Sequence, residues 1–328
     1  MHILIVNNTR IPVAQYGGTE RVIWWLGKQL VQMGHRVSYL VEAGSHCDFA
    51  EVFTLNPAIP FNQQIPVGVD VVHLNCKVNE LPTIPYIVTV HGNSNEIIPL
   101  DINTVFVSKN HAARYGSESY VHNGIDPADY GDPGLNKPRN YFHFLGDAAW
   151  RVKNVRGAIK IAQKAQIKLR IIGGVRFNVN QGIRLTFDPR IRFDGMKGGA
   201  EKNAILSQSK GLIFPVLWNE PFGLSIVESL YFGCPVFATP YGSLPEIVQP
   251  EVGFLSNKVN ALVDAVQHAN DFDRKICHEY VMDKFSSTQM AIQYLVKYET
   301  VLNQQALNKT VPMLQQVQTE KFLPFTYD

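Results

Sequence analysis

Short apolar runs and one amphipathic segment fill the first third of the chain. Residues 2–7, HILIVN, form a β-branched run that predicts a buried strand. Residues 19–33 carry apolar side chains at helical spacing, with Thr19 as the expected N-cap and Gly34 as the expected stop. The apolar stripe of this predicted helix consists of Val22, Trp25, Leu26, Leu30 and Met33. Further strands are predicted at 35–41, 69–74, 85–90 and 104–107.

The same pattern begins again after residues 127–138, a Pro- and Gly-rich segment that we interpret as a linker. Strands are predicted at 141–145, 167–172, 190–194, 211–214 and 235–238. Helices are predicted at 154–165, 200–208 and 223–232, and residues 259–305 are expected to be almost entirely helical. Strands that alternate with helices predict an α/β fold with parallel sheets, here in two units covering 1–136 and 137–300 with a tail at 301–328. Ligands of such sheets bind beyond the carboxyl ends of the strands, so we expect a cleft between the units.

Length and composition fit a globular protein of two domains. The chain has 328 residues, and a single hydrophobic core rarely grows beyond about 250–300 residues. The start lacks the basic prelude and apolar length of a signal peptide, and no apolar run approaches the roughly 20 residues of a membrane span. Four widely spaced cysteines without a CxxC motif predict reduced thiols, with neither a disulfide framework nor a zinc site: Cys47, Cys76, Cys234 and Cys277. We therefore expect a cytoplasmic protein without stable membrane insertion.

The charge is unevenly distributed between the two predicted units. Residues 1–136 contain 7 Lys and Arg against 12 Asp and Glu, a net charge of −5, while residues 137–328 contain 23 against 16, a net charge of +7. The basic second part suits an anionic ligand such as a nucleotide diphosphate, although ordinary solvated surface charges explain the balance equally well. No dense basic cluster with interleaved aromatic residues occurs, which argues against nucleic acid. The acidic first unit would be repelled by anionic lipids, which leaves only transient membrane contact open.

Candidate chemistry is concentrated in residues 219–228, NEPFGLSIVE. Pro221 and Gly223 predict a loop that turns into a helix after the strand at 211–214. The first amides of that helix, near Leu224 and Ser225, lack helical partners and would bind an anion. Carboxylates are strong acceptors for sugar hydroxyls, so Glu220 and Glu228 could hold the sugar and the ribose of a nucleotide sugar. A surface helix with two solvated glutamates is the alternative.

The sequence around this segment resembles a known family. Residues 212–255 are similar to retaining glycosyltransferases of family 4, the group 1 enzymes of the GT-B class, whose hallmark is Glu, seven residues and Glu, with PFG after the first. That hallmark is intact at Glu220 and Glu228. Further matches are Gly17 and Gly18 in GGTERV, His91 in VTVHGN, and the later Gly233, Pro235, Gly242 and Glu246. The resemblance spans about residues 1–300.

The resemblance implies two Rossmann-like domains whose sheets face each other across a cleft, with the tail returning to the first domain. It implies a UDP- or GDP-sugar donor held mainly by the second domain and a hydroxyl acceptor, a glycan, a lipid-linked or a small molecule, in the first. His91 would face the donor sugar, Glu220 would bind its hydroxyls, and Lys153 would stabilise the departing diphosphate. Donor binding is implied for Gly17, Gly18, Arg151, Gly195, Met196, Phe222, Gly223, Leu224, Ser225 and Glu228. No cofactor and no metal are expected, because the single DxD, at 271–273, lies among terminal helices; no oligomeric state is predicted.

Two departures from the family pattern keep alternatives open. Gly146 is followed by Asp147 where the family carries an arginine, and Arg151 could supply the lost charge. Gln15 stands where glycogen-synthase-like relatives carry a lysine, which argues against a starch- or glycogen-synthase identity. A non-catalytic nucleotide-sugar-binding protein and a nucleotide-sugar 2-epimerase are therefore alternatives, although the EPFG block argues against the epimerase.

Overall fold

The chain forms two compact units, which we describe separately. The computed structural model describes residues 1–13, 17–178 and 184–327, so Gln15 lies outside the described residues. Among these, unit 1 contains residues 1–13, 17–126 and 285–318, and unit 2 contains residues 127–284 and 319–327.

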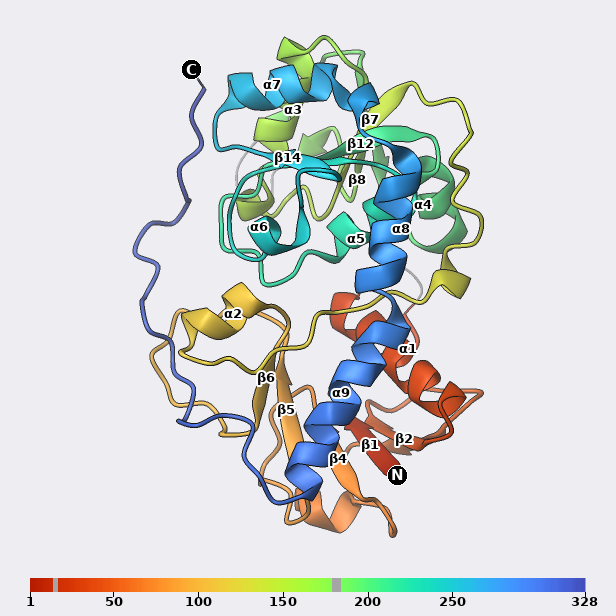
Figure 1. Ribbon diagram of the computed structural model, residues 1–328, viewed down its shortest axis with the longest axis vertical. Helices are drawn as coiled ribbons and strands as arrows, with labels where there is room; N and C mark the ends of the chain where they lie inside the picture. The colour runs from red at the N-terminus through yellow and green to blue at the C-terminus, as the bar shows by residue number, and fades with distance from the viewer. Residues whose placement is uncertain (14–16, 179–183, 328) are drawn as a thin grey trace. The chain divides into compact units, whose positions relative to one another are not determined.

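Unit 1 is built on a parallel six-stranded sheet in the order β3-β2-β1-β4-β5-β6 (Figure 1). Its strands are β1 (His2–Val6), β2 (Arg36–Val41), β3 (Glu51–Thr54), β4 (Val71–Leu74), β5 (Tyr86–Val90) and β6 (Thr104–Phe106). Its helices are α1 (Gly18–Gln32), η1 (Phe61–Gln64), α2 (Lys109–Arg114) and α9 (Ser287–Leu302). The central strands β1 and β4 are buried at every position, as their mainly apolar sequences predict, and each also buries one histidine, His2 or His73.

Helices α1 and α9 cover one face of this sheet. The Tyr39 hydroxyl of β2 donates to the Ile23 carbonyl of α1 at 3.1 Å. Close packing there requires Gly27, because a Cβ at that position would lie 2.0 Å from the same hydroxyl. On α9, the Tyr298 hydroxyl lies 2.8 Å from Nδ1 of His73 on β4. Residues 285–300, which the sequence assigned to the second domain, therefore belong to unit 1, because α9 packs on its sheet.

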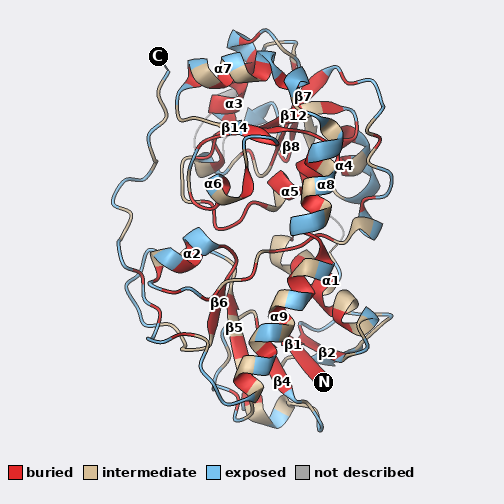
Figure 2. Cartoon of the chain, in the orientation of Figure 1, coloured by how far each residue is buried: buried red, intermediate tan, exposed pale blue. Residues whose placement is uncertain are grey.

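Unit 2 repeats the architecture with a parallel sheet in the order β11-β8-β7-β12-β13-β14. Its strands are β7 (Tyr141–Leu145), β8 (Leu169–Ile172), β11 (Ile191–Gly195), β12 (Ser209–Phe214), β13 (Val236–Ala238) and β14 (Gly253–Leu255), with a small antiparallel pair, β9 (Phe177–Asn178) and β10 (Arg184–Leu185). Its helices are η2 (Pro127–Asp129), η3 (Arg151–Lys153), α3 (Val155–Lys164), α4 (Gly199–Leu206), α5 (Leu224–Tyr231), α6 (Leu244–Ile247), α7 (Val259–Gln267), η4 (Ala269–Asp271) and α8 (Arg274–Lys284). Figure 2 shows burial concentrated on the strands of both sheets. The predicted α/β class, with a parallel sheet in each half, is confirmed.

The N-cap expected at Thr19 is wrong. Helix α1 begins one residue earlier, at Gly18, and Gly17 is its N-cap without any side-chain hydrogen bond. A Cβ at Gly17 would lie 2.7 Å from the Val13 side chain and 2.8 Å from that of Glu20. The tight approach of these two side chains explains why a glycine, and not a capping hydroxyl, starts the helix.

The tail is divided between the two units. Residues 303–318 lie in unit 1, where the Leu100 amide donates to the Pro312 carbonyl at 2.8 Å. Residues 319–327 lie on unit 2, where the Leu323 amide donates to the Leu217 carbonyl at 2.8 Å. The tail was expected to return to the first domain as a whole, and its last residues instead complete the second.

Candidate active site

A buried ion pair lies at the carboxyl end of the unit 2 sheet. Lys153 ends η3, between β7 and α3, and Glu220 lies in the loop between β12 and α5. The Lys153 ammonium donates to both carboxylate oxygens of Glu220, at 2.9 and 2.7 Å, and the two side chains are 11% and 8% exposed. Burying either charge alone would be costly, and in the ion pair each charge compensates the other. The structure thus brings together two of the three predicted catalytic residues.

Aromatic side chains surround this pair. The indole N–H of Trp218 donates to Glu220 at 2.7 Å. The Lys153 ammonium lies 5.1 Å from the ring centre of Trp218, 5.5 Å from that of Trp150 and 5.2 Å from that of Phe214, all within the range of cation–π attraction. Neither tryptophan was predicted as a site residue, although Trp218 stands only two residues before Glu220.

Helix α5 begins as the motif predicted. Gly223 is its N-cap in a left-handed conformation, with φ of 93°, and no side chain caps the helix. Leu224 and Ser225, in its first turn, are partly exposed, so their amides can meet an anion. Phe222 is buried, and its carbonyl accepts a hydrogen bond of 2.7 Å from the Ser243 hydroxyl. The helix start is therefore rigidly held and chemically available.

The loop after β13 fixes the backbone of Glu220. The Ser243 amide donates to the Glu220 carbonyl at 2.9 Å. At the preceding Gly242, with φ of 65°, an added Cβ would lie 2.3 Å from both the nitrogen and the carbonyl oxygen of Glu220. Only glycine fits this approach of one backbone to another. Residues 242–248, GSLPEIV, thus hold residues 220–223, EPFG, in place.

Glu228 occupies a separate, closed environment. It is 2% exposed. One oxygen accepts a hydrogen bond of 2.7 Å from the Tyr130 hydroxyl and pairs with the ammonium of Lys202, itself 5% exposed. Its charge partner is thus Lys202 of α4 and not Lys153. Lys202 and Tyr130 were not predicted as partners of Glu228. They lie 26 and 98 positions from it in the sequence, and only the fold brings them together.

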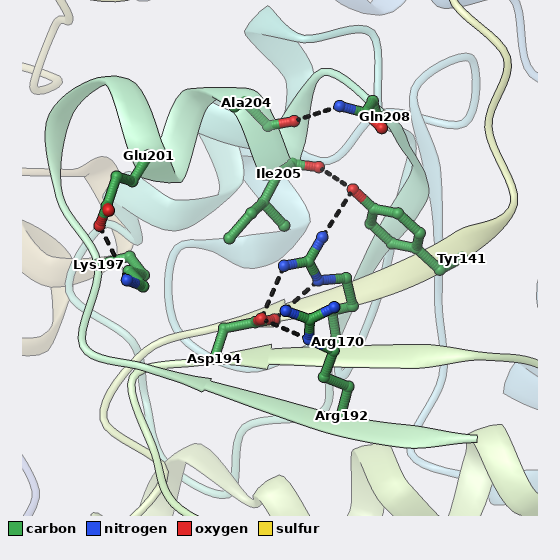
Figure 3. Close-up of polar contacts among 9 residues, drawn as sticks. All are labelled: Tyr141, Arg170, Arg192, Asp194, Lys197, Glu201, Ala204, Ile205 and Gln208. Carbon is green, nitrogen blue, oxygen red and sulfur yellow. Dashed lines mark hydrogen bonds and ion pairs between the residues drawn. The ribbon is translucent and has the colours of Figure 1, made fainter. Parts of the chain in front are cut away.

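Gly195 and Met196, which were predicted to bind the donor, lie at the end of β11. Gly195, with φ of 73°, ends the strand, and its carbonyl accepts from the Gly173 amide at 2.7 Å. Met196 is 42% exposed. Asp194, directly before them, is clamped by Arg170 through two hydrogen bonds of 2.8 and 2.7 Å (Figure 3). This clamp ties the end of β11 to β8, its neighbour in the sheet.

Arg151 and Asp147 do not repeat the family's arginine. Arg151 is exposed and its guanidinium lies 4.9 Å from the ring centre of Phe322 in the tail. One oxygen of Asp147 accepts from the Ala149 amide at 2.9 Å and so stabilises the turn after β7. Arg151 shares η3 with Lys153, and its role as a substitute for the family's arginine stays a prediction.

The third predicted catalytic residue, His91, lies in unit 1 directly after β5. Its Nε2 is 2.8 Å from Oδ1 of Asn75. The Asn75 amide nitrogen faces the carbonyls of Val6 and His73, at 3.4 and 3.3 Å, so Oδ1 must accept from His91. Burial lowers the pKa of His91 to about 4, so the neutral ring carries its proton on Nε2 and leaves Nδ1 as an acceptor.

His91 lines a cavity of about 620 Å³ within unit 1. Thr19 and Glu20, which follow Gly17 and Gly18 at the start of α1, line the same cavity. The predicted glycine loop and the predicted histidine therefore lead to one pocket, at the carboxyl ends of the strands where ligands of parallel sheets bind.

The DxD sequence lies between two helices of unit 2, η4 and α8, as expected. Asp271 ends η4, and Asp273 directly precedes α8, where it accepts from the Lys275 amide at 2.7 Å. Within the part of the chain that the structure describes, no group of three or more His, Cys, Asp and Glu side chains is arranged to hold a metal ion. Over the same residues, every helix is too short or too polar to cross a lipid bilayer.

Comparison with known proteins adds a family match over unit 2. The family model described as glycosyl transferases group 1 matches residues 127–274, which include the Lys153–Glu220 pair. A curated protein of Klebsiella pneumoniae, described as an uncharacterized 41.2 kDa protein in the cps region, is 28% identical over 149 residues. That match covers 43% of this chain and 40% of the relative, so less than half of the relative's length is represented.

Solved structures resemble the whole fold. AviGT4, a glycosyltransferase involved in avilamycin A biosynthesis, is 20% identical and superposes with a TM-score of 0.77 over 92% of this chain and 98% of its own. HepE of Anabaena in complex with UDP-glucose is 15% identical, with a TM-score of 0.61 over 92% of this chain and 100% of its own. The predicted GT-B architecture is confirmed at the level of the fold.

Proposed function

We propose that this chain is a retaining glycosyltransferase of family 4 that moves a sugar from a UDP- or GDP-sugar to a hydroxyl acceptor in the cytoplasm, without a metal ion. The observation that carries the proposal is the buried Lys153–Glu220 pair, which lies within the residues matched by the group 1 family model. The match supports glycosyl transfer as the class of reaction. The UDP-glucose complex of a protein with the same fold supports a nucleotide-sugar donor.

The chemistry assigned to unit 2 is binding of the donor and stabilisation of its leaving group. Breaking the bond between sugar and diphosphate leaves negative charge on the diphosphate, which needs a cation or oriented amides close by. Lys153 supplies the cation, and the first amides of α5, at Leu224 and Ser225, supply the dipoles. Glu220, fixed by Lys153 and Trp218, is assigned to the sugar hydroxyls, and Glu228 to the ribose.

The acceptor is assigned to unit 1 and the retaining outcome to the leaving group itself. In a retaining transfer of this kind, the new glycosidic bond forms on the face from which the diphosphate departs. The departing phosphate takes the proton of the acceptor hydroxyl. His91, neutral above its pKa of about 4, then acts as a hydrogen-bonding partner for a hydroxyl and not as a charged group.

A panel of UDP-, GDP- and ADP-sugars tests the proposal, with nucleotide and sugar products followed by mass spectrometry. Slow donor hydrolysis to nucleotide and free sugar, undiminished by EDTA, is expected. Glu220→Gln should remove most of this turnover, and Glu228→Gln should weaken nucleotide binding. Glu279→Gln on α8, where Glu279 is exposed and pairs with Lys275 at 3.5 Å, is the matched control. Activity that disappears with EDTA and returns with manganese would overturn metal independence, and NMR of a transfer product would test retention.

A non-catalytic nucleotide-sugar-binding protein is the second candidate. The observation that favours it is Asp147, which stands in place of the family's arginine and whose carboxylate is used in a turn. Saturable nucleotide-sugar binding without any hydrolysis would establish this candidate instead. Release of an epimeric nucleotide sugar would point to the 2-epimerase.

A further inference from the structure

The interior strand β5 of unit 1 is covered on one face and open on the other. Ile87 and Thr89 are buried, whereas Val88 and Val90 are only half-buried, although β5 lies between β4 and β6. Helix α9 covers the buried face, where the Thr89 hydroxyl lies 3.1 Å from that of Tyr294. Interior strands of parallel sheets are normally buried on both faces. The half-buried valines therefore mark a gap in the cover of the sheet.

This gap is the cavity of about 620 Å³ that His91 lines, a size that accommodates a small organic molecule. Aliphatic side chains form a continuous part of its wall along the sheet and the neighbouring loops, and Lys77, Thr89, Asp101 and Thr104 interrupt it. The aliphatic residues are Leu74, Val78, Leu81, Val88, Val90 and Leu100. Polar side chains follow the carboxyl ends of the strands, with Asn75 after β4 and His91 after β5. The cavity thus has a polar end and an apolar body.

We infer that this cavity binds a hydroxyl compound with an aliphatic body, its hydroxyl toward His91 and Asn75 and its body against the valines of β5. The inference rests on the proposed function in that this compound is the acceptor of the transfer. His91 donates to Asn75 through Nε2, so its Nδ1 can accept the hydrogen bond of an incoming hydroxyl.

The aliphatic wall disfavours a glycan as the occupant. Every sugar hydroxyl that leaves water needs a new hydrogen-bond partner, and valine and leucine side chains provide none. Asp101, which also lines the cavity, is already engaged, because it accepts from the Tyr86 hydroxyl and the Asn103 amide, both at 2.7 Å. An aliphatic body needs no such partners and gains from leaving water.

The segment 93–101, of which residues 98–101 line the cavity, is tied to the tail by hydrogen bonds. The Leu100 amide donates to the Pro312 carbonyl at 2.8 Å. Asn95 and Gln318 exchange two hydrogen bonds, of 3.0 and 2.8 Å, through the side chain of Asn95 and the backbone of Gln318. The cavity is therefore pre-formed, so a ligand does not have to order the loop on binding.

The test is binding of octan-1-ol to the full chain without nucleotide, measured by ligand-observed NMR titration. Val88→Phe should weaken binding at least tenfold because the added ring fills the cavity, and Val88→Thr should weaken it about threefold because it makes the wall polar. Val296→Phe is the matched control, since Val296 is exposed on α9, and it should bind octan-1-ol as the parent does. Methyl glucoside should show no binding at the same concentrations.

Two patterns of ligand binding would overturn the inference, as would the absence of octan-1-ol binding. One is octan-1-ol binding that neither Val88 variant weakens while both keep the parent's melting temperature. The other is binding of methyl glucoside that the Val88 variants weaken, which would assign the cavity to sugars. Because the titration contains no nucleotide, its outcome is independent of the donor-hydrolysis assay. Donor hydrolysis without octan-1-ol binding would overturn this inference and leave the proposed function intact. Octan-1-ol binding without donor hydrolysis would overturn the proposed function and leave the binding of an aliphatic hydroxyl compound intact.

Discussion

Lys153 holds both carboxylate oxygens of Glu220, at 2.9 and 2.7 Å, and both side chains are about nine-tenths buried. The lysine that is assigned to the diphosphate is thus already neutralised by the glutamate assigned to the sugar. Under the proposed function, a nucleotide-sugar donor that contacts both residues must compete with this ion pair. Binding of the diphosphate by Lys153 and binding of the sugar by Glu220 would therefore be coupled.

The pair should show a large coupling energy in a double-mutant cycle. Lys153→Met and Glu220→Gln each leave a buried group without its partner, and each should lower the free energy of unfolding, the lysine change by about 3–5 kcal/mol. The double variant should be more stable than the sum of the two losses allows, because no uncompensated charge remains. Urea unfolding measures all four proteins. Additive losses would mean that the two charges are not coupled.

Gly242→Ala should damage the site far more than an alanine at an equivalent glycine. A Cβ at Gly242 would lie 2.3 Å from the Glu220 backbone, whereas Gly131, with φ of 67° against 65° at Gly242, has nothing within 4 Å of such a Cβ. Both changes incur the cost of alanine at positive φ, about 1–2 kcal/mol, but only Gly242→Ala must move the loop that carries Glu220. Thermal unfolding and nucleotide binding should both be impaired in Gly242→Ala. Equal effects of the two substitutions would contradict this account.

The strands that the sequence predicted are those with mainly apolar sequences. Residues 2–7 and 69–74 were expected as strands and fold as β1 and β4 at the centre of the sheet. The missed strands lie at sheet edges: β3 is the mostly exposed sequence EVFT, and β14 has only three residues. Edge strands are defined by pairing with a neighbour more than by their own side chains, so their sequences carry little signal.

The motif named residues of the site but not their partners. Glu220 and Glu228 follow from one local pattern, yet the structure gives them different cations, Lys153 and Lys202. Lys202 lies on a predicted helix with no feature that distinguishes it from a surface lysine. Such pairing depends on tertiary contacts, which no local spacing encodes.

Substitutions of the two partners of Glu228 should lower the free energy of unfolding by different amounts. Lys202→Met removes the charge partner of a carboxylate that is 2% exposed and should lower the free energy of unfolding by about 3–5 kcal/mol. Tyr130→Phe removes one hydrogen bond to the same carboxylate and should cost about 1.5–3 kcal/mol. Urea unfolding of both variants is the measurement. If Tyr130→Phe proved the more damaging, Lys202 would not be the main partner of Glu228.

Buried histidines in both units should make the protein sensitive to acid, among them His73 in unit 1 and His143 in unit 2. His73 lies between the hydroxyls of Thr89 and Tyr298, both at 2.8 Å, and His143 lies between those of Ser209 and Ser229, at 2.7 and 2.8 Å. Burial lowers the pKa of each to about 3, from an ordinary 6.5. Between these values the unfolded chain binds a proton that the folded chain does not.

Stability should therefore fall as the pH falls from about 6.5 toward 3, by up to roughly 1.4 kcal/mol per pH unit for each histidine, and should not depend on these groups above that range. Urea unfolding at pH 7.0, 5.5 and 4.5 measures the slope, and His143→Gln should reduce it. The control is His268→Gln, because His268 is exposed and its pKa is raised by the carbonyl and carboxylate of Asp264. His268→Gln should lose as much stability in acid as the parent protein does. A free energy of unfolding that stays constant from pH 7.0 to 4.5 would show that the buried histidines are not held neutral.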